Sequence, residues 1–409
     1  MTTREFDVIV WGASGFTGSL VVEYLAANYG VNGDLKWAIA GRNRAKLEAV
    51  RAQYLADEQQ ALLPILISDS HDESALAELV GKTRVICTTV GPYALYGTPL
   101  VAACVSAGTH YCDLTGEVHW MAQIIPQYQQ AAQESGARIV HTCGFDSIPF
   151  DLGTWFLQDA MLRQHGVAAR HVKGRVGRNS AAASGGTIAS MLNMMEEAKQ
   201  NPAIRKIMAN PYSLNPAGVK RGPDGPDQNG VRFDPDFGQW TSPFIMAAIN
   251  TRVVRRSNAL LGFPWGVDFA YDESSLNKSR LSAIRAGVAT GLGMLAMAIG
   301  PTRSLLARVL PKPGEGPSQE VREAGFYEIF FHGVHPHDSA KDLRAKVTGD
   351  MDPGYGSTSK MLAEAAVCLA KDELAVEGGF WTPAAAMNQK LIDRLVSNAG
   401  LSFELVPLN

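Results

Sequence analysis

Three glycines spaced three residues apart follow a short apolar stretch near the start of the chain. Residues 6–11 read as a buried strand, and Gly12, Gly15 and Gly18 come next, in the sequence GASGFTG. Glycines at these points permit a tight strand-to-helix turn, let a phosphate reach bare backbone N–H groups and let helix and strand pack closely. The spacing departs from the common GxGxxG fingerprint, so a glycine-rich turn without a ligand is the alternative. The candidate phosphate-binding residues are Gly12, Ser14, Gly15, Phe16, Thr17 and Gly18.

The end of the second apolar stretch, in the sequence AGRNRAKL, distinguishes between two nucleotides. In a dinucleotide-binding fold, an acidic residue at this point accepts a hydrogen bond from the ribose 2′-hydroxyl, whereas an arginine accommodates a 2′-phosphate. Ala40 stands where the acid is expected, and Arg42 and Asn43 follow it. Arg44 and Lys46 add positive charge nearby, although the solvated face of the next helix explains them equally well. The sequence therefore predicts that the chain binds NADP(H).

The loops after the third and fourth predicted strands complete the candidate nucleotide site. Asp69 follows the third strand and is placed to meet the adenine end of the nucleotide, unless it is simply solvated. The sequence TTVGPYALYG, residues 88–97, follows the fourth strand at the edge of a parallel sheet where ligands bind. We therefore expect this loop to pass under the nicotinamide, with contacts from Val90, Gly91 and Pro92.

Alternating strands and helices with short connections occupy residues 1–150, which predicts an α/β, Rossmann-type domain with a doubly wound parallel sheet. From residue 151 the alternation stops, and residues 151–352 are predicted to form a second, α+β substrate domain with a long loop at 201–241. Helices within residues 353–400 are expected to pack back on the first domain. First-domain strands are expected at 6–11, 35–40, 63–67, 84–88, 110–112 and 137–141, and helices include 72–80, 98–107 and 126–135. In the second domain, strands are expected at 171–177, 325–334 and 342–349, with a helix at 186–200.

The composition is that of an ordinary globular protein. The chain has 409 residues, of which 46% are hydrophobic and 19% charged, and its net charge of −3 argues against nucleic acid as a partner. Five cysteines without CxxC spacing predict reduced core residues, and the nine histidines suggest no metal site. The start MTTREFD runs directly into the first strand and does not read as a signal peptide, so we expect a cytoplasmic protein.

One uncharged segment, AGVATGLGMLAMAIGP at residues 286–301, has arginines on both sides. It is shorter than the roughly 20 apolar residues that a membrane-spanning helix needs. Two interpretations stay open: a buried helix, or an interfacial segment that lies in a membrane surface and makes the protein peripheral.

Several motifs together resemble those of a known family. They are GASGFTG, AGRN, VGPYALYG, CVSAGTHYCDLTGE, CGFDSIPFDLG, SGGTIAS and GGFWTPAAAM. Together they resemble the saccharopine dehydrogenase-like oxidoreductases, and within them the branch that holds the mycobacterial trans-acting enoyl reductases and the animal saccharopine dehydrogenase-like oxidoreductase. The resemblance implies NADPH-dependent reduction of a small-molecule or lipid-like substrate, with an enoyl group favoured. Animal members are associated with lipid droplets, which favours a lipid-surface contact through residues 286–301.

An enoyl reduction needs a hydride at the β-carbon, a group that stabilises the enolate and a proton donor for the α-carbon. Tyr93 is the first candidate for a catalytic phenol and Tyr96 the second, because their loop is expected beside the nicotinamide. Packing against the cofactor explains Tyr93 equally well. Asp146 and Ser147 are candidates for positioning substrate or water, although a helix cap explains Asp146 better.

Two other functions stay open. An imine or amino-acid dehydrogenase of the saccharopine type would present arginines such as Arg175, Arg178 or Arg232 to substrate carboxylates. A non-catalytic NADP-binding protein would dock on lipid surfaces through residues 286–301. The sequence determines neither the substrate nor the direction of the reaction, and it leaves the oligomeric state open, a homodimer included.

Overall fold

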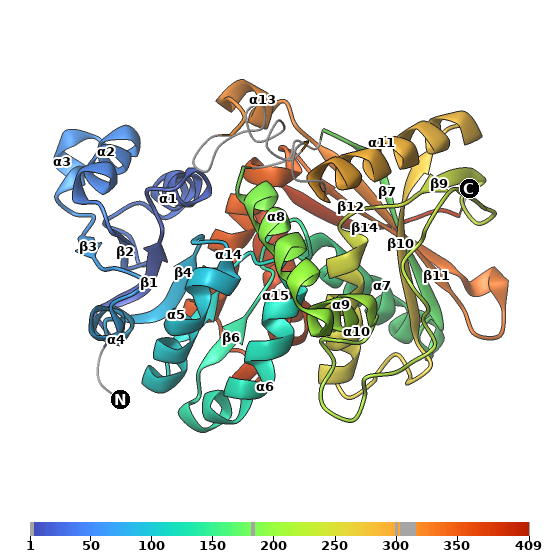
Figure 1. The fold of residues 1–409 in the computed structure, drawn as a ribbon, viewed down its shortest axis with the longest axis horizontal. Coiled ribbons are helices and arrows are strands. Elements are labelled where there is room, and N and C mark those ends of the chain that lie inside the picture. The colour runs from blue at the N-terminus through green and yellow to red at the C-terminus, as the bar shows by residue number, and fades with distance from the viewer. Residues whose placement is uncertain (1–3, 181–184, 299–301, 303–315, 409) are drawn as a thin grey trace.

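The computed structural model describes residues 4–180, 185–298, 302 and 316–408, and these form two seven-stranded sheets (Figure 1). The first sheet lies to the left in Figure 1, is parallel throughout and has the strand order β13-β6-β5-β4-β1-β2-β3. The direction of winding reverses between β1 and β4, which is where dinucleotides bind in such sheets. The strands are β1 (Phe6–Trp11), β2 (Trp37–Gly41), β3 (Ile65–Ile67), β4 (Thr83–Thr88), β5 (His110–Cys112), β6 (Arg138–Val140) and β13 (Gly379–Trp381).

Helices cover both faces of this sheet, which is why every residue of β1 is buried. Val8 and Val10 belong to the core that contains α1, α2 and α14, whereas Ile9 and Trp11 belong to the core that contains α4, α5 and α6. These helices are α1 (Phe16–Tyr29), α2 (Arg44–Tyr54), α4 (Glu73–Gly81), α5 (Tyr93–Ala107), α6 (Val118–Ser135) and α14 (Thr358–Lys371). The predicted Rossmann-type fold is therefore confirmed.

The second sheet lies to the right in Figure 1, is mixed and has the order β14-β12-β11-β7-β10-β9-β8. Strands β7 and β10 pair in parallel, and the other neighbours are antiparallel. The strands are β7 (His171–Asn179), β8 (Arg232–Asp234), β9 (Gln239–Ser242), β10 (Ala270–Asn277), β11 (Tyr327–Val334), β12 (Leu343–Gly349) and β14 (Leu401–Val406). The helices that pack on it are α7 (Ile148–His165), α10 (Ala247–Leu260) and α11 (Arg280–Ala298).

The remaining helices connect these layers. They are α3 (Asp57–Gln60), α8 (Gly185–Gln200), α9 (Pro202–Ala209), α13 (Gln319–Glu323), α15 (Pro383–Asn398) and the short turns η1 (Ser339–Lys341) and η2 (Pro353–Ser357). The C-terminal part of the chain returns to the first sheet, because α14 packs across β1, β4 and β5 and β13 pairs with β6. One hydrophobic core runs through residues of both sheets. The domain boundaries at residues 150 and 352 stay predictions.

Some predicted element bounds were wrong. Helices α5 and α6 begin at residues 93 and 118 rather than 98 and 126, and Pro99 and Pro126 lie inside them. The predicted starts fall at the prolines, which are favoured in a helix's first turn, but the preceding residues Tyr93 and Trp120 are buried and extend both helices. The region 201–241, predicted as one long loop, contains α9, β8 and most of β9.

The close packing expected at Gly18 is present. A Cβ at Gly18 would lie 2.2 Å from the carbonyl oxygen of Gly12 and 2.8 Å from Thr89 Oγ1, so the first turn of α1 sits directly on the end of β1. Only glycine leaves room for this approach.

We expect Gly18→Ala to lower the free energy of unfolding by about 1–3 kcal/mol, because the backbone has to move apart to admit the methyl group. Gly81→Ala is the matched control, since a Cβ at this helical glycine has no atom within 4 Å and alanine favours helix. Urea unfolding measures both effects. Equal unfolding midpoints for the two variants would contradict the packing argument.

Candidate functional site

The glycine turn, the end of β2 and the loop after β4 meet at the carboxyl edge of the first sheet. Gly12 has a φ of +87°, and a Cβ there would lie 2.5 Å from Val90 Cγ2. Thr89 Oγ1 donates to the Gly12 carbonyl oxygen at 3.3 Å and so ties the two loops together. The Gly15 N-cap of α1 is exposed and provides no side-chain cap for the helix. The first N–H groups of α1 are therefore available to an anion.

The other residues of this turn lie around the same helix start. Ser14 and Thr17 are partly exposed, and the Phe16 ring packs edge-to-face on Tyr355 with ring centroids 4.7 Å apart. Tyr355 lies in η2, so the glycine turn also touches the C-terminal part of the chain.

The residues expected at the adenosine end lie after β2 and β3. Arg42 is exposed, and the Asn43 side chain accepts a hydrogen bond from Lys46 N at 3.0 Å, which caps α2. The backbone N–H of His71 donates to Asp69 at 2.9 Å. This bond, the His71 side chain and the nearby charge of Arg42 lower the pKa of Asp69. Arg42 and Asp69 are thus close enough to interact, as expected of two groups at one end of a nucleotide.

The two tyrosines proposed for catalysis point to different places. The Tyr93 hydroxyl donates to the Thr88 carbonyl oxygen at 3.2 Å, its ring stacks on Trp120, and the side chain is 2% exposed. Tyr96 packs edge-to-face against His71 with centroids 5.8 Å apart, on the adenosine side. This geometry favours the packing role for Tyr93 and places Tyr96 away from the expected nicotinamide position.

Asp146 and Ser147 lie in the loop after β6, at the same edge of the sheet. Asp146 is half-buried, no described residue donates to its carboxylate, and burial raises its pKa to about 6. Ser147 is the N-cap residue of α7, and its hydroxyl donates to Asn250 Oδ1 at 3.3 Å. The helix-cap explanation for Asp146 is therefore unsupported, and its carboxyl group is free to act on a ligand.

A buried carboxylate that was not predicted as a site residue lies beside the loop after β4. Glu117 is 1% exposed and accepts hydrogen bonds from Tyr93 N and Ala94 N, both at 2.8 Å, and from Ser190 Oγ at 2.9 Å. Glu117 stands in the motif DLTGE, but its contact with the start of α5 arises only because β4 and β5 lie side by side in the sheet.

A second unpredicted polar group lies behind Ser147. Asn250 Nδ2 donates to Glu273 Oε2 at 3.0 Å, and the Tyr271 hydroxyl donates to Glu273 Oε1 at 2.9 Å. Burial raises the pKa of Glu273 to about 8. This network joins the loop after β6 to the second sheet.

The arginines that an amino-acid substrate would need have partners within the chain. Arg175 Nε lies 2.7 Å from Asp234 Oδ2, and its Nη1 lies 2.7 Å from Asp272 Oδ1. Arg178 pairs with Glu328 at 3.0 Å. Arg232 lies exposed on β8.

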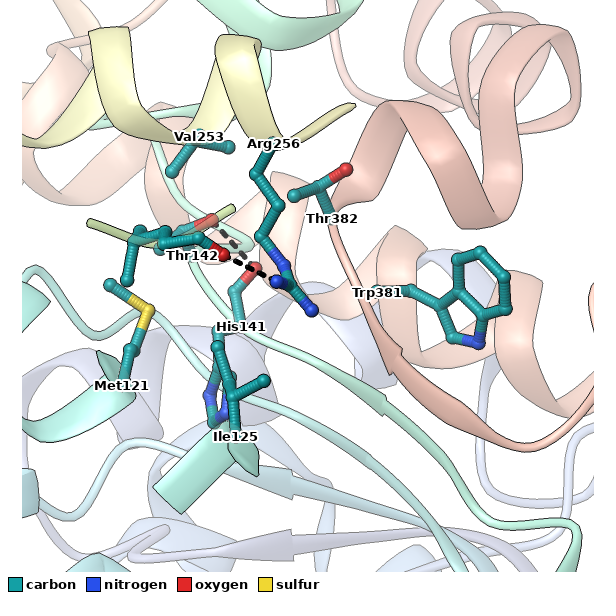
Figure 2. A pocket seen from close by; sticks show the side chains of 9 residues that line it. Met121, Ile125, His141, Thr142, Val253, Arg256, Trp381 and Thr382 are labelled. Carbon is teal, nitrogen blue, oxygen red and sulfur yellow. Dashed lines mark hydrogen bonds between the residues drawn. The ribbon is translucent and has the colours of Figure 1, made fainter. Parts of the chain in front are cut away.

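A small cavity of about 10 Å³ lies at the ends of β6 and β13 (Figure 2). The guanidinium of Arg256 projects between Thr142 and Trp381 and donates to the carbonyl oxygens of Leu214 and Phe380, which fixes α10 to β13. The cavity has room for about one water molecule, which is too little for a substrate.

The apolar segment forms part of α11 as far as residue 298, and residues 299–301 lie outside the described residues. Its described side chains are mostly exposed, so the buried-helix interpretation is wrong for this part. In the described part of the chain, no helix is long and apolar enough to cross a membrane. Among the same residues, no group of three or more His, Cys, Asp or Glu side chains is arranged to hold a metal ion, and all five cysteines are buried free thiols.

Comparison with known proteins identifies a nucleotide-binding domain and full-length relatives. Residues 8–140 match the model of the saccharopine dehydrogenase NADP-binding domain. The chain is 42% identical to the putative trans-acting enoyl reductase Rv2449c of Mycobacterium tuberculosis, with 100% of this chain and 99% of that protein covered. It is 37% identical to the trans-acting enoyl reductase of Mycobacterium bovis, with 96% of each covered.

The fold is also similar to a solved structure. Saccharopine dehydrogenase (L-Glu forming) from Saccharomyces cerevisiae superposes with a TM-score of 0.54 at 13% identity, over 98% of this chain and 99% of that one. The chain therefore belongs to the saccharopine dehydrogenase-like oxidoreductases, in the branch of the trans-acting enoyl reductases, and is an NADP-dependent oxidoreductase.

Proposed function

We propose that the protein uses NADPH to reduce the enoyl group of a lipid-like substrate. The observation that carries this proposal is the full-length similarity to proteins named trans-acting enoyl reductases. The geometry supports it, because the phosphate-binding turn, Arg42 and the Asp146 carboxyl group, which has no donor among the described residues, all lie at one edge of the first sheet. The proposal includes a cytoplasmic location.

The proposed cofactor residues divide the nucleotide between three loops. The turn Gly12–Gly18 receives the pyrophosphate at the start of α1. Arg42 receives the 2′-phosphate, with Asn43 and Asp69 beside it. The loop of Val90, Gly91 and Pro92 lies under the nicotinamide, since it packs on the glycine turn and leads into α5.

In the reaction, bound NADPH supplies the hydride that reaches the substrate's β-carbon. Asp146 holds the proton that the α-carbon then takes, because its raised pKa keeps part of its population protonated near neutral pH. Ser147, held by Asn250, orients the substrate or an ordered water molecule. A hydrogen-bond donor at this edge of the sheet has to stabilise the negative charge that develops on the thioester oxygen.

The amino-acid alternative receives less support. Arg175 and Arg178 already pair with carboxylates of this chain, so neither is free to bind a substrate carboxylate. That chemistry would need a compact site lined with arginines that have no carboxylate partner, and Arg175 and Arg178 do not provide it.

The function is tested by following NADPH absorbance with a trans-2-enoyl thioester of N-acetylcysteamine. We expect turnover by the wild type, and we expect Asp146→Asn to lower kcat about 10²–10⁴-fold because the α-carbon loses its proton donor. In the wild type, kcat falls as the pH rises above about 6, since Asp146 has to be protonated to act as an acid, and this dependence disappears in Asp146→Asn. Turnover by Asp146→Asn equal to that of the wild type would remove Asp146 from the mechanism.

The nucleotide preference is tested separately. We expect Arg42→Asp to weaken NADPH binding about 10–100-fold and to change NADH binding less than threefold, because only NADPH carries the 2′-phosphate. Arg44→Asp is the matched control, since Arg44 is directed along α2 towards Glu48, 3.8 Å away. Titration calorimetry measures the affinities of the wild type and of both variants for NADPH and for NADH. Equal losses of NADPH and NADH would contradict the assigned role of Arg42.

We further propose that α11 rests on an anionic lipid surface. Five large apolar side chains, 41–60% exposed, recur every three or four residues and so share one face of the helix: Leu281, Ile284, Val288, Leu292 and Leu295. Lys278, Arg280 and Arg285 lie at its N-terminal end, and α11 contains no acidic residue. An apolar face with cations beside it is typical of helices that lie in a membrane interface.

Sedimentation with phosphatidylglycerol-containing vesicles tests this contact. We expect the wild type to bind and the variant Val288→Glu with Leu292→Glu to lose binding, because two carboxylates would enter the lipid. Val267→Glu with Val396→Glu is the control, since both valines are exposed elsewhere. If the α11 variant instead converts a dimer into a monomer without affecting vesicle binding, the face is an interface between two copies.

A further inference from the structure

The carboxylate of Glu117 occupies the N-terminus of α5, a helix from another part of the first domain. Oε1 accepts from Tyr93 N and Oε2 accepts from Ala94 N, and these are the first two residues of the helix. Pro92, the N-cap residue, provides no side-chain cap. Glu117 therefore supplies both the acceptors and the negative charge that the start of this helix needs.

The same carboxylate reaches across to the second half of the chain. Ser190 of α8 donates to Oε1 at 2.9 Å, and a Cβ at Gly91 would lie 3.7 Å from Ser190 Oγ. Glu117 thus contacts α8 and the residues that directly follow the loop of Val90, Gly91 and Pro92.

A second contact repeats this connection two turns further along α8. Glu197 Oε2 lies 3.0 Å from Nε2 of the buried His119, within ion-pair distance although not aligned as a hydrogen bond. Asn193 donates to Glu197 Oε1 at 2.8 Å. Because Ser190, Asn193 and Glu197 are three and seven residues apart, they share one face of α8. That polar face is turned toward the start of α6, where Glu117 and His119 lie.

We propose that Glu117 is a positioning residue, which holds the nicotinamide-side loop and α8 in the arrangement needed for hydride transfer. The inference rests on the proposed function, because it assumes that this loop lies under the nicotinamide. Without the Glu117 acceptors, the start of α5 loses two buried hydrogen bonds, and α8 loses the Ser190 hydrogen bond and keeps only the contact of Glu197 with His119. The loop before α5 then no longer has a fixed end, while the residues after β2 and β3 at the adenosine end keep their own hydrogen bonds.

The pKa of Glu117 is raised, because burial outweighs the hydrogen bonds that the carboxylate accepts. Desolvation raises the pKa of Glu117, whereas the two backbone N–H groups, Ser190 and the charge of His119 lower it. The N–H groups therefore offset part of the cost of keeping a charge there, and the charged form is the one that accepts from both.

The experiment compares the two halves of the nucleotide. Calorimetry with NADPH measures the whole ligand, and 2′,5′-ADP measures the adenosine half alone. We expect Glu117→Gln, in which one oxygen becomes a donor, to weaken NADPH about 10-fold while 2′,5′-ADP changes less than twofold. Turnover of the enoyl thioester falls about 10²-fold, a loss typical of small misplacements of reacting groups. Glu134→Gln, an exposed change on α6, the helix that Glu117 directly precedes, is the control and behaves as the wild type.

Two results would overturn the inference. Equal losses of NADPH and 2′,5′-ADP show a general structural role, and wild-type behaviour shows no role. If Glu117→Gln does not fold, Ser190→Ala decides, since it keeps both backbone bonds: lower turnover with unchanged 2′,5′-ADP affinity supports the proposal, and unchanged turnover overturns it. A wild type that binds both ligands without reducing the enoyl probe contradicts the proposed function alone, because the comparison of the two ligands still tests Glu117.

Discussion

The rest of the site depends on how closely three pieces of backbone approach one another at the end of β1. A Cβ at Gly18 would lie 2.2 Å from the Gly12 carbonyl oxygen, and a Cβ at Gly12 would lie 2.5 Å from Val90. With no side chain between them, the start of α1 meets the carboxyl edge of the sheet and the loop after β4 packs on the same turn. Arg42 lies on one side of this contact and the loop before α5 on the other. These three pieces of backbone meet at the edge where dinucleotides bind in such sheets.

Buried carboxylates hold helix starts that come from distant parts of the chain. Glu117 accepts from the first N–H groups of α5, and Asp151 accepts from Ala384 N of α15 at 2.8 Å and from Ser257. Burial raises the pKa of Asp151 to about 7. Asp352 caps an adjacent element instead: it directly precedes η2 and accepts from two of its backbone N–H groups, just before α14. In each case a helix end, with its partial positive charge, provides the partner that a buried carboxylate requires.

Much of the first domain could be predicted from local patterns. Strands buried on both faces read as short apolar runs, and glycine spacing marks the strand-to-helix turn, so the order of elements followed from the residues. The predicted helix starts at residues 98 and 126 were wrong, because burial of the preceding turn outweighed the preference of proline for a helix's first turn. Helices α7 and α10 and strand β10 went unrecognised, since their polar groups, such as Asn250 and Glu273, satisfy one another only in the fold.

The sequence by itself determined the class of the protein. The glycine turn, the absence of an acid at Ala40 and the arginine at 42 are chemical requirements of the nucleotide, and each can be recognised within a few neighbouring residues. Only the tertiary structure decided which polar side chains face the site. Tyr93 turned into the core because its hydroxyl donates to the Thr88 carbonyl there, whereas Asp146 lies at the edge of the sheet, where no residue in the described part of the chain donates to its carboxyl group. Glu117 gained its place because β4 and β5 lie side by side and α8 returns from the second half of the chain. Such pairings join residues far apart in sequence, so local spacing carries no signal for them.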